Sequence, residues 1–189
     1  MASHVAYDMV HELATEQHGL LTATQASAIG VAPKTLVAMA ARGRLERVSY
    51  GVYRDRRVPE DRWTPYMAAA LWPYGTVGLL IGETVLVLLD LSDVNPAVIH
   101  IAVPVAYRAR RRPPPPGVVV HHANVLAVER TAIEGVPATT VQRAIRDCAK
   151  AHLGPALLRQ AINDARKSGW LTTEEKRDLM RNLTTAGNL

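Results

Sequence analysis

The sequence of 189 residues contains no phenylalanine and only three tryptophans and six tyrosines, so its core must be built mainly from Leu, Val, Ile and Ala. A single cysteine, Cys148, excludes an internal disulfide and any zinc site made of several cysteines. The longest apolar stretch, 77–91, contains Glu83 and Asp90 and is too short to span a bilayer. Residues 1–17 contain no Lys or Arg, so no signal peptide is apparent. We therefore expect a cytoplasmic protein with no membrane segment.

The basic residues are distributed unevenly along a chain of otherwise ordinary globular composition. The formal net charge is +5, yet residues 1–32 sum to −3 and residues 33–57 to +5. Residues 58–105 then sum to −4 and residues 106–117 to +4. A basic block inside a folded segment indicates a polyanion partner, although charge alone favours a solvated face.

The first third of the chain has the pattern of a winged helix-turn-helix. The spacing of apolar residues predicts helices at 4–18, 23–29 and 33–42, followed by strands at 45–48 and 51–54. Thr22 is placed to cap the second helix, and Pro33 is a favoured first residue for the third. In that third helix we expect Leu36, Val37 and Ala40 to face inward and Met39 to face outward.

The remainder of the chain predicts a second, mixed unit. We expect a linker at 55–62, a helix at 63–71, a helix rather than a strand at 79–91, and an exposed basic, proline-rich loop at 108–116. Strands are predicted at 98–105, 118–121 and 127–133, and helices at 140–151, 155–167 and 173–183. The predicted fold is α+β, with a winged helix-turn-helix DNA-binding domain at 1–57 and a mixed α/β domain at 63–189 that ends in helices.

The third predicted helix and the hairpin hold the candidate DNA contacts. In a helix-turn-helix the corresponding helix enters the major groove, and cations around it reach phosphates. Each arginine taken alone is also compatible with a solvated surface charge. The predicted DNA-binding residues are Lys34, Thr35, Ala38, Arg42, Arg44, Arg47, Tyr50 and Arg54.

Several short motifs give the chain a family resemblance. Residues 19–54 include Gly-Leu-Leu-Thr-Ala-Thr-Gln-Ala, Lys-Thr-Leu, Arg-Gly-Arg-Leu-Glu-Arg-Val and Gly-Val-Tyr-Arg, and they resemble the winged-helix domain of AbiEi-family antitoxins. Ile-Gly-Glu-Thr at 81–84, His-Ile-Ala-Val-Pro at 100–104 and Glu-Gly-Val-Pro-Ala-Thr-Thr at 134–140 resemble the second domain of that family. The loop at 108–116 and the pair Val85-Leu86 depart from the family pattern.

The resemblance implies a bacterial antitoxin that neutralises a cognate AbiEii-like nucleotidyltransferase toxin, directly or functionally. It also implies autoregulation, in which the winged helix binds inverted repeats in the operon's own promoter and represses transcription. Two alternatives stay open: a stand-alone winged-helix transcriptional regulator, and an antitoxin that inactivates its toxin by covalent modification. The oligomeric state is left open, because two monomers or one dimer can fill paired half-sites.

The second unit offers basic helix faces but no recognisable catalytic motif. The candidate toxin-antagonism surface consists of Arg143, Arg146, Lys150, Arg159, Arg166 and Lys167, although the pattern favours ordinary polar faces opposite apolar stripes for most of them. The stripes are Val141, Ile145 and Cys148 on one helix and Leu158, Ile162 and Ala165 on the next. His121 and His122 are adjacent on a predicted strand and point to opposite faces, so no metal site is expected. The sequence contains no Gly-rich phosphate-binding loop, and no cofactor is expected.

Overall fold

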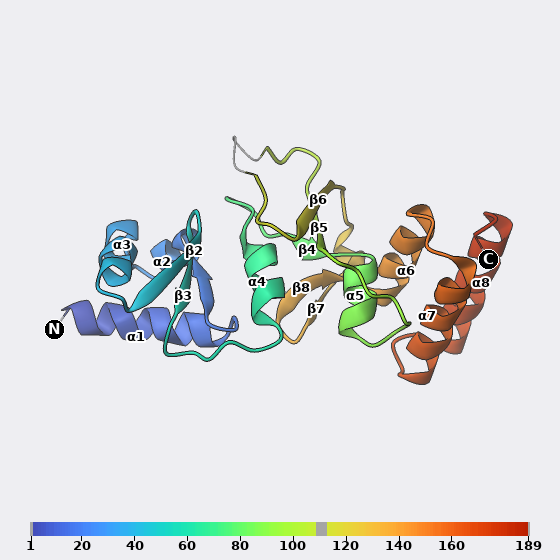
Figure 1. Cartoon of the computed structure of the whole chain (residues 1–189), viewed down its shortest axis with the longest axis horizontal. Coiled ribbons are helices and arrows are strands. Elements are labelled where there is room, and N and C mark those ends of the chain that lie inside the picture. The colour runs from blue at the N-terminus through green and yellow to red at the C-terminus, as the bar shows by residue number, and fades with distance from the viewer. Residues whose placement is uncertain (1, 109–112, 189) are drawn as a thin grey trace. The chain divides into compact units, whose positions relative to one another are not determined.

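The computed structural model describes residues 2–108 and 113–188 and confirms the α+β class. The chain divides into two compact units, and Figure 1 labels the helices and strands of both. The first comprises Met1–Gly78, Tyr107–Pro116 and Ile133–Pro137, and the second comprises Leu79–Ala106, Gly117–Ala132 and Ala138–Leu189. The predicted domain boundaries at residues 57 and 63 stay predictions.

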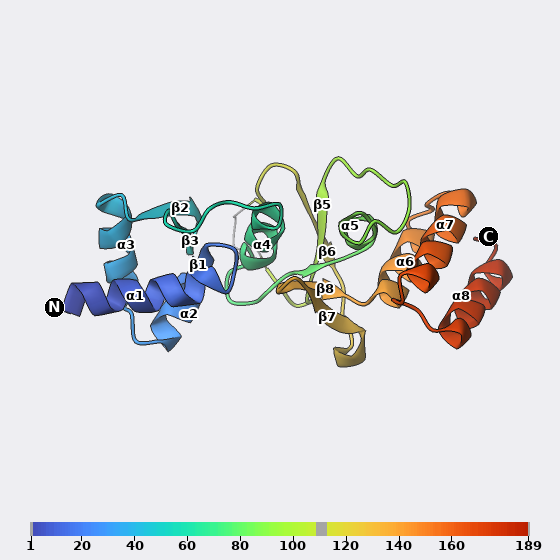
Figure 2. The ribbon, with the colours of Figure 1, turned by 90° about the horizontal axis from the view of Figure 1, so that it is seen from below.

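The first unit has the element order of a winged helix (Figure 2). Its elements are α1 (Ala2–Thr15), β1 (Leu20–Thr22), α2 (Ala23–Ala28), α3 (Pro33–Ala41), β2 (Leu45–Ser49), β3 (Val52–Asp55) and α4 (Thr64–Leu71). The three strands form an antiparallel sheet in the order β1-β3-β2. The helices α1, α2 and α3 and the hairpin lie where the sequence predicts them, but β1 was not predicted.

Local sequence signals explain where these helices begin and end. The Gln25 backbone N–H donates to Thr22 Oγ1 at 3.1 Å, and the Thr22 backbone N–H donates to Gln25 Oε1 at 2.8 Å, which together form a capping box at the start of α2. After α1 the chain turns at Gly19, whose φ is +84° and whose added Cβ would lie 3.2 Å from the Cβ of Val58. Both the positive φ and the close approach require glycine at this turn.

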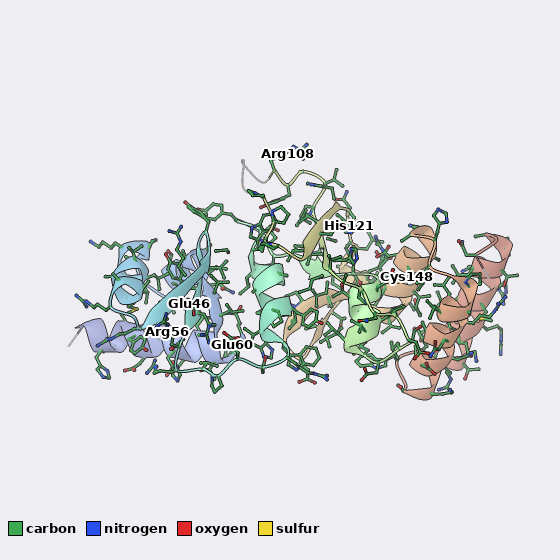
Figure 3. The ribbon with its side chains drawn as sticks, viewed as in Figure 1. Glu46, Arg56, Glu60, Arg108, His121 and Cys148 are labelled. Carbon is green, nitrogen blue, oxygen red and sulfur yellow. The ribbon has the colours of Figure 1, made fainter. Side chains whose placement is uncertain are left out.

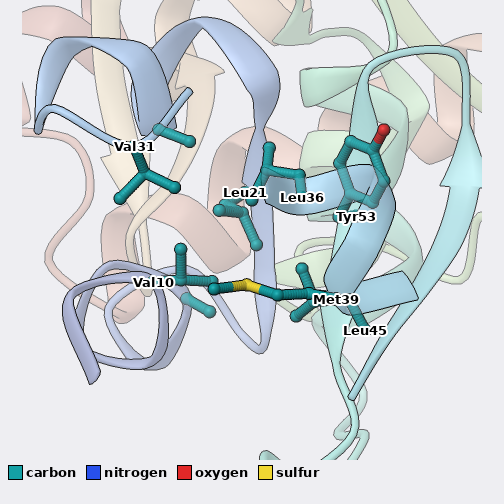
Figure 4. Packing of buried hydrophobic residues seen from close by; sticks show 9 residues of the cluster. Val10, Leu21, Val31, Leu36, Met39, Leu45 and Tyr53 are labelled. Atoms are coloured by element: carbon teal, nitrogen blue, oxygen red, sulfur yellow. The ribbon is translucent and has the colours of Figure 1, made fainter. Parts of the chain in front are cut away.

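A single apolar cluster holds α1, α2, α3 and the sheet together (Figure 4). Its buried members are Val10, Ala14, Leu21, Ala26, Val31, Leu36, Met39, Leu45 and Tyr53. Met39 extends between Val10 and Leu45 (Figure 4) and is 2% exposed, whereas Val37 is 57% exposed. The predicted orientations of Val37 and Met39 are therefore wrong. Residues 36 and 39 share one face of α3, and residue 37 is rotated about 100° from residue 36.

The remaining elements surround a second, mixed sheet. They are β4 (Leu79–Leu80), α5 (Glu83–Leu88), β5 (Ile99–Val103), β6 (Val118–His122), the 3-10 helix η1 (Ala127–Glu129), β7 (Arg130–Ile133), β8 (Val136–Thr139), α6 (Val141–Lys150), α7 (Pro155–Lys167) and α8 (Thr173–Thr185). The sheet order is β6-β5-β4-β8-β7, in which β4 pairs antiparallel with β5 and parallel with β8. Strands β5 and β6 pair in parallel.

Three predictions are corrected by the structure, two in this region and one in the first unit. The helix predicted at 79–91 is the strand β4 followed by the short helix α5, because Gly82 turns the chain at φ +56° and Leu80 pairs with Ile101 and Ala138. The strand predicted at 127–133 begins as η1, where the Leu126 N–H donates to the Glu129 carboxylate at 3.3 Å. The predicted linker at 55–62 begins one residue too early, because the side chain of Asp55 is buried at the end of β3.

The C-terminal helices follow the predicted ranges closely. Both predicted apolar stripes of α6 and α7 are buried. The predicted capping box at the start of α8 is present, with the Glu175 N–H donating to Thr172 Oγ1 at 3.1 Å. The predicted loop at 108–116 falls partly on residues 109–112, which lie outside the described residues. In the described ranges, no helix has both the length and the apolar character needed to cross a membrane.

Candidate nucleic-acid interface

Helix α3 presents a face of small, apolar and basic residues to solvent. Lys34, Val37, Ala41 and Arg42 are exposed, and Thr35 and Ala38 are half-buried beside them. The helix begins with Pro33 after Ala32, and no side chain caps its first backbone N–H groups. Because an uncapped helix N-terminus attracts anions, the first turn of α3 is suited to a phosphate or a base edge.

The sequence around this helix contains no acidic residue from Gln17 to Leu45. In the part of the chain that the structure describes, no carboxylate lies within ion-pair distance of Lys34, Arg42, Arg44 or Arg47. These four side chains, which we call the unpaired cations, all come from the predicted DNA-binding set. Unpaired positive charge of this kind attracts a polyanion without first having to break an ion pair.

The turn between β2 and β3 carries a cation stacked on an aromatic ring. The Arg47 guanidinium lies 5.4 Å from the centroid of the Tyr50 ring, and its Nε donates to the Ser49 carbonyl at 3.4 Å. Tyr50 is 50% exposed. Stacking of this kind orders an arginine while leaving its charge available. The β2–β3 hairpin therefore carries a positioned positive charge beside its turn.

A buried carboxylate anchors the opposite end of the hairpin. Asp55 accepts hydrogen bonds from the His11 ring at 2.8 Å and from the Arg57 backbone N–H at 2.9 Å, and it pairs with the Arg57 guanidinium at 3.3 Å. Burial alone would raise the pKa of Asp55, but these hydrogen bonds and the charge of Arg57 hold that pKa below its ordinary value. This network ties β3 to α1 and takes Arg57 out of the set of unpaired cations.

Tyr7 of α1 lies under two of the guanidinium groups. Its ring centroid is 3.8 Å from the Cζ of Arg57 and 5.0 Å from the Cζ of Arg44. Burial, followed by the nearby charge of Asp55, raises the pKa of the Tyr7 phenol. This contact could not be predicted from local sequence patterns, because Tyr7 is far from Arg44 and Arg57 along the chain. Arg44 is thus positioned by an aromatic ring rather than by a carboxylate.

Arg54 has a different environment from the unpaired cations. Its guanidinium lies 3.2 Å from the Glu46 carboxylate and 3.3 Å from that of Glu60, and the side chain is 17% exposed. Arg56 also approaches Glu46, at 4.0 Å (Figure 3). Glu46 lies directly opposite Arg54 across the two strands, so the pair follows from the hairpin register. A phosphate at Arg54 would compete with two carboxylates.

The basic residues predicted to form the toxin-antagonism surface are also in two kinds of environment. Arg143 is held by the carboxylates of Glu129 and Asp147, with its Nε 2.9 Å from Asp147, and its side chain is 15% exposed. Although burial favours its neutral form, these carboxylates raise the pKa of Arg143. Arg146 approaches the Glu129 carboxylate at 4.0 Å, and Lys167 pairs with Asp164 at 3.2 Å. The Arg166 Nε donates to Thr173 Oγ1 at 3.2 Å. Lys150 and Arg159 are exposed.

A cavity of about 420 Å³ in the second unit is lined by His100 and His121, which are far apart in the sequence. His100 Nδ1 lies 3.0 Å from His121 Nε2 across the paired strands β5 and β6. Burial, and then the neighbouring His100, lower the pKa of His121. Cys148 also lines the cavity, and its burial raises the thiol pKa to about 12. The described residues contain no cluster of three or more His, Cys, Asp or Glu that suits a metal ion.

Comparison with known proteins finds a family that the N-terminal segment is similar to. Residues 8–54 match the family described as the transcriptional regulator, AbiEi antitoxin. The match extends from α1 to β3 and covers about a quarter of the chain. It confirms, over these residues, the resemblance found in the sequence motifs. None of the curated proteins compared with the chain matches it.

Proposed function

We propose, from the AbiEi match over residues 8–54, that the protein is an antitoxin that represses its own operon and neutralises a cognate nucleotidyltransferase toxin. One observation carries the DNA-binding half of this proposal. The matched segment contains the four unpaired cations, which lie on and around the exposed face of α3. A protein that acts on promoter DNA in this way works in the cytoplasm, and we place it there.

In this proposal α3 is the recognition helix. Lys34 and Thr35 in its first turn lie closest to base edges and phosphates, and the small side chain of Ala38 lets the helix approach the bases. Arg42 and Arg44 follow at the C-terminal end of the helix, where they contact the phosphate backbone. Arg47 and Tyr50 extend the contact from the tip of the wing. The inverted repeats of the promoter then accommodate two copies of this unit.

Arg54 stays in the proposed DNA-binding set with a smaller expected contribution. Its pairs with Glu46 and Glu60 offset its charge, so a phosphate gains less from it than from an unpaired cation. This difference provides a matched comparison within one hairpin, because Arg47 and Arg54 are both arginines of the wing strands.

For residues 63–189 we propose the toxin-antagonism role, with the exposed basic side chains of α6 and α7 as the contact surface. Lys150 and Arg159 are the best-placed members, because both are exposed and, within the described residues, neither pairs with a carboxylate as Arg146 and Lys167 do. Arg143 supports that surface by joining α6 to η1 through Glu129. Arg146, Arg166 and Lys167 complete the proposed surface.

Co-expression with the neighbouring gene tests the toxin half of the proposal. If that gene encodes a nucleotidyltransferase that arrests growth, co-expression of this protein restores growth. If the neighbour is not such a toxin, or growth stays arrested, the antitoxin role is wrong and a stand-alone regulator is the remaining interpretation. Incubating the two purified proteins with ATP and weighing the toxin distinguishes neutralisation without modification from covalent inactivation, which adds mass.

A gel-shift titration on the promoter duplex tests the DNA half. We expect the wild-type protein to retard that duplex at concentrations that leave a scrambled duplex unbound. Arg177→Ala serves as the control for lost surface charge, because Arg177 is exposed on α8, outside the proposed DNA-binding set. Equal retardation of both duplexes would contradict sequence-specific repression.

A further inference from the structure

Val37 occupies the middle of the exposed face of α3. Its side chain is 57% exposed, and the residue four positions later, Ala41, is exposed on the same face. Lys34 and Arg42 lie toward the two ends of the helix, and in the described chain neither has a carboxylate partner. The face is thus apolar at its centre and positively charged at its ends.

Folding of the first unit does not require a valine at this position. Val37 is not a member of the buried cluster that includes Leu36 and Met39. Valine also has a lower helix propensity than alanine, which fills several neighbouring positions of α3. A single exposed valine is ordinary on a protein surface. Its position between two unpaired cations on this helix is what indicates a ligand.

We infer that Val37 is a specificity-determining residue that packs against the 5-methyl group of a thymine in the major groove of duplex DNA. The inference rests on the proposed function, because it assigns a base contact to the proposed recognition helix. The cations at the ends of α3 and the absence of acidic residues from Gln17 to Leu45 select a polyanion as the occupant of this face. In the major groove, the thymine methyl is the apolar group that a valine can recognise.

The expected size of the effect follows from the transfer of one methyl group out of water. Removing one buried methyl group lowers the affinity about fourfold, and removing the methyl groups of two contacted thymines lowers it about 15-fold. Replacing thymine with deoxyuridine removes this methyl and leaves every hydrogen-bonding group of the base pair unchanged. The substitution therefore isolates the contact that Val37 is inferred to make.

The experiment is a double-mutant cycle on the promoter duplex, measured by fluorescence anisotropy with the full chain. Each thymine in the footprinted half-site is replaced in turn by deoxyuridine, against wild type, Val37→Ala and Val37→Thr. We expect the affinity of the wild-type protein to fall about fourfold when deoxyuridine replaces thymine at one or two positions. The affinity of Val37→Ala should not change with the same replacements. Val37→Thr, which keeps one methyl, should retain part of the sensitivity.

Val5→Ala is the matched control, because Val5 is 60% exposed on α1 and lies outside the proposed interface. For Val5→Ala, each deoxyuridine replacement should change the affinity by the same factor as for the wild-type protein. If Val37→Ala keeps the wild-type profile at every thymine, the inference is overturned while the proposed function stands. If the wild-type protein shows no preference for its promoter, the proposed function fails, and this inference fails with it. If Val37→Ala instead abolishes self-association in sedimentation, the valine belongs to an interface between copies and the inference is wrong.

Discussion

The salt dependence of DNA binding separates the unpaired cations from the cations that are already held by carboxylates. Arg44 and Arg47 have no carboxylate within ion-pair distance in the described chain, whereas Arg54 has two, at 3.2 and 3.3 Å. An arginine that neutralises a phosphate releases a counterion and adds about 0.9 to the slope of log affinity against log salt. An arginine already neutralised by Glu46 and Glu60 adds much less.

The double variant Arg44→Ala with Arg47→Ala should therefore lower the slope by about 1.8. Over a fourfold rise in salt, from about 50 to about 200 mM, a slope difference of this size narrows the affinity gap between wild type and variant by about 12-fold. Arg54→Ala should change the slope by well under half of the double-variant effect. Fluorescence anisotropy on the promoter duplex, repeated at five salt concentrations, measures all three slopes.

Two results would refute this reasoning. An unchanged slope for the double variant would show that DNA does not contact the wing and the end of α3. A slope change for Arg54→Ala as large as that of a single unpaired arginine would show that the ion pairs do not decide which cations bind phosphate. Circular dichroism of each variant confirms that the hairpin is intact before the slopes are compared.

The remaining predictions concern stability and reactivity. Met39→Ala should lower the free energy of unfolding by roughly 2–5 kcal/mol, because Met39 is 2% exposed. Val37→Ala should change it by less than about 0.5 kcal/mol. Urea denaturation measures both changes, and equal losses would contradict the assigned faces of α3. Because the folded-state pKa of Asp55 is lowered, its contribution to stability is present above the unfolded pKa of about 3.9 and is lost as the pH falls through the folded value. The stability difference between wild type and Asp55→Asn should therefore be full at about pH 6 and shrink below about pH 4, and a difference that grows in acid would reverse the assigned sign. Cys148, with a thiol pKa of about 12, should react slowly with iodoacetamide at neutral pH until urea unfolds the chain, and rapid labelling of the folded protein by mass spectrometry would show that the thiol is accessible.

Elements with local signals were predictable from the sequence. Thr22 and Thr172 each stand three residues before a Gln or Glu that completes a capping box, so the starts of α2 and α8 follow from neighbouring residues alone. The burial of Ile145 and Ile162 follows in the same way from apolar spacing along α6 and α7.

Elements that depend on distant partners were not predictable. Leu79 and Leu80 lie in a long apolar run that suits a helix, and they form a strand because β5 and β8 hydrogen-bond to them. Alanine at several positions of α3 gives that helix more than one apolar face, so contacts with α1 and β2 decide that Met39 is buried and Val37 is exposed. The pairing of Arg54 with Glu46 likewise requires the hairpin register, and its pairing with Glu60 requires the path of the chain after β3.

Whether the basic residues at 33–57 can bind a polyanion depends on which of them already form ion pairs within the folded chain. Counted along the sequence, residues 33–57 carry a net +5, which does not distinguish a DNA-binding surface from a solvated one. In the folded chain the cations divide by position. Those that follow the hairpin turn pair with carboxylates and stabilise the sheet, namely Arg54, Arg56 and Arg57. The cations before that turn are the unpaired ones, and three of the four fall inside the acid-free run from Gln17 to Leu45. Because no carboxylate pairs with them in the described residues, their charge is available to a partner, and it surrounds α3, whose centre presents the exposed Val37.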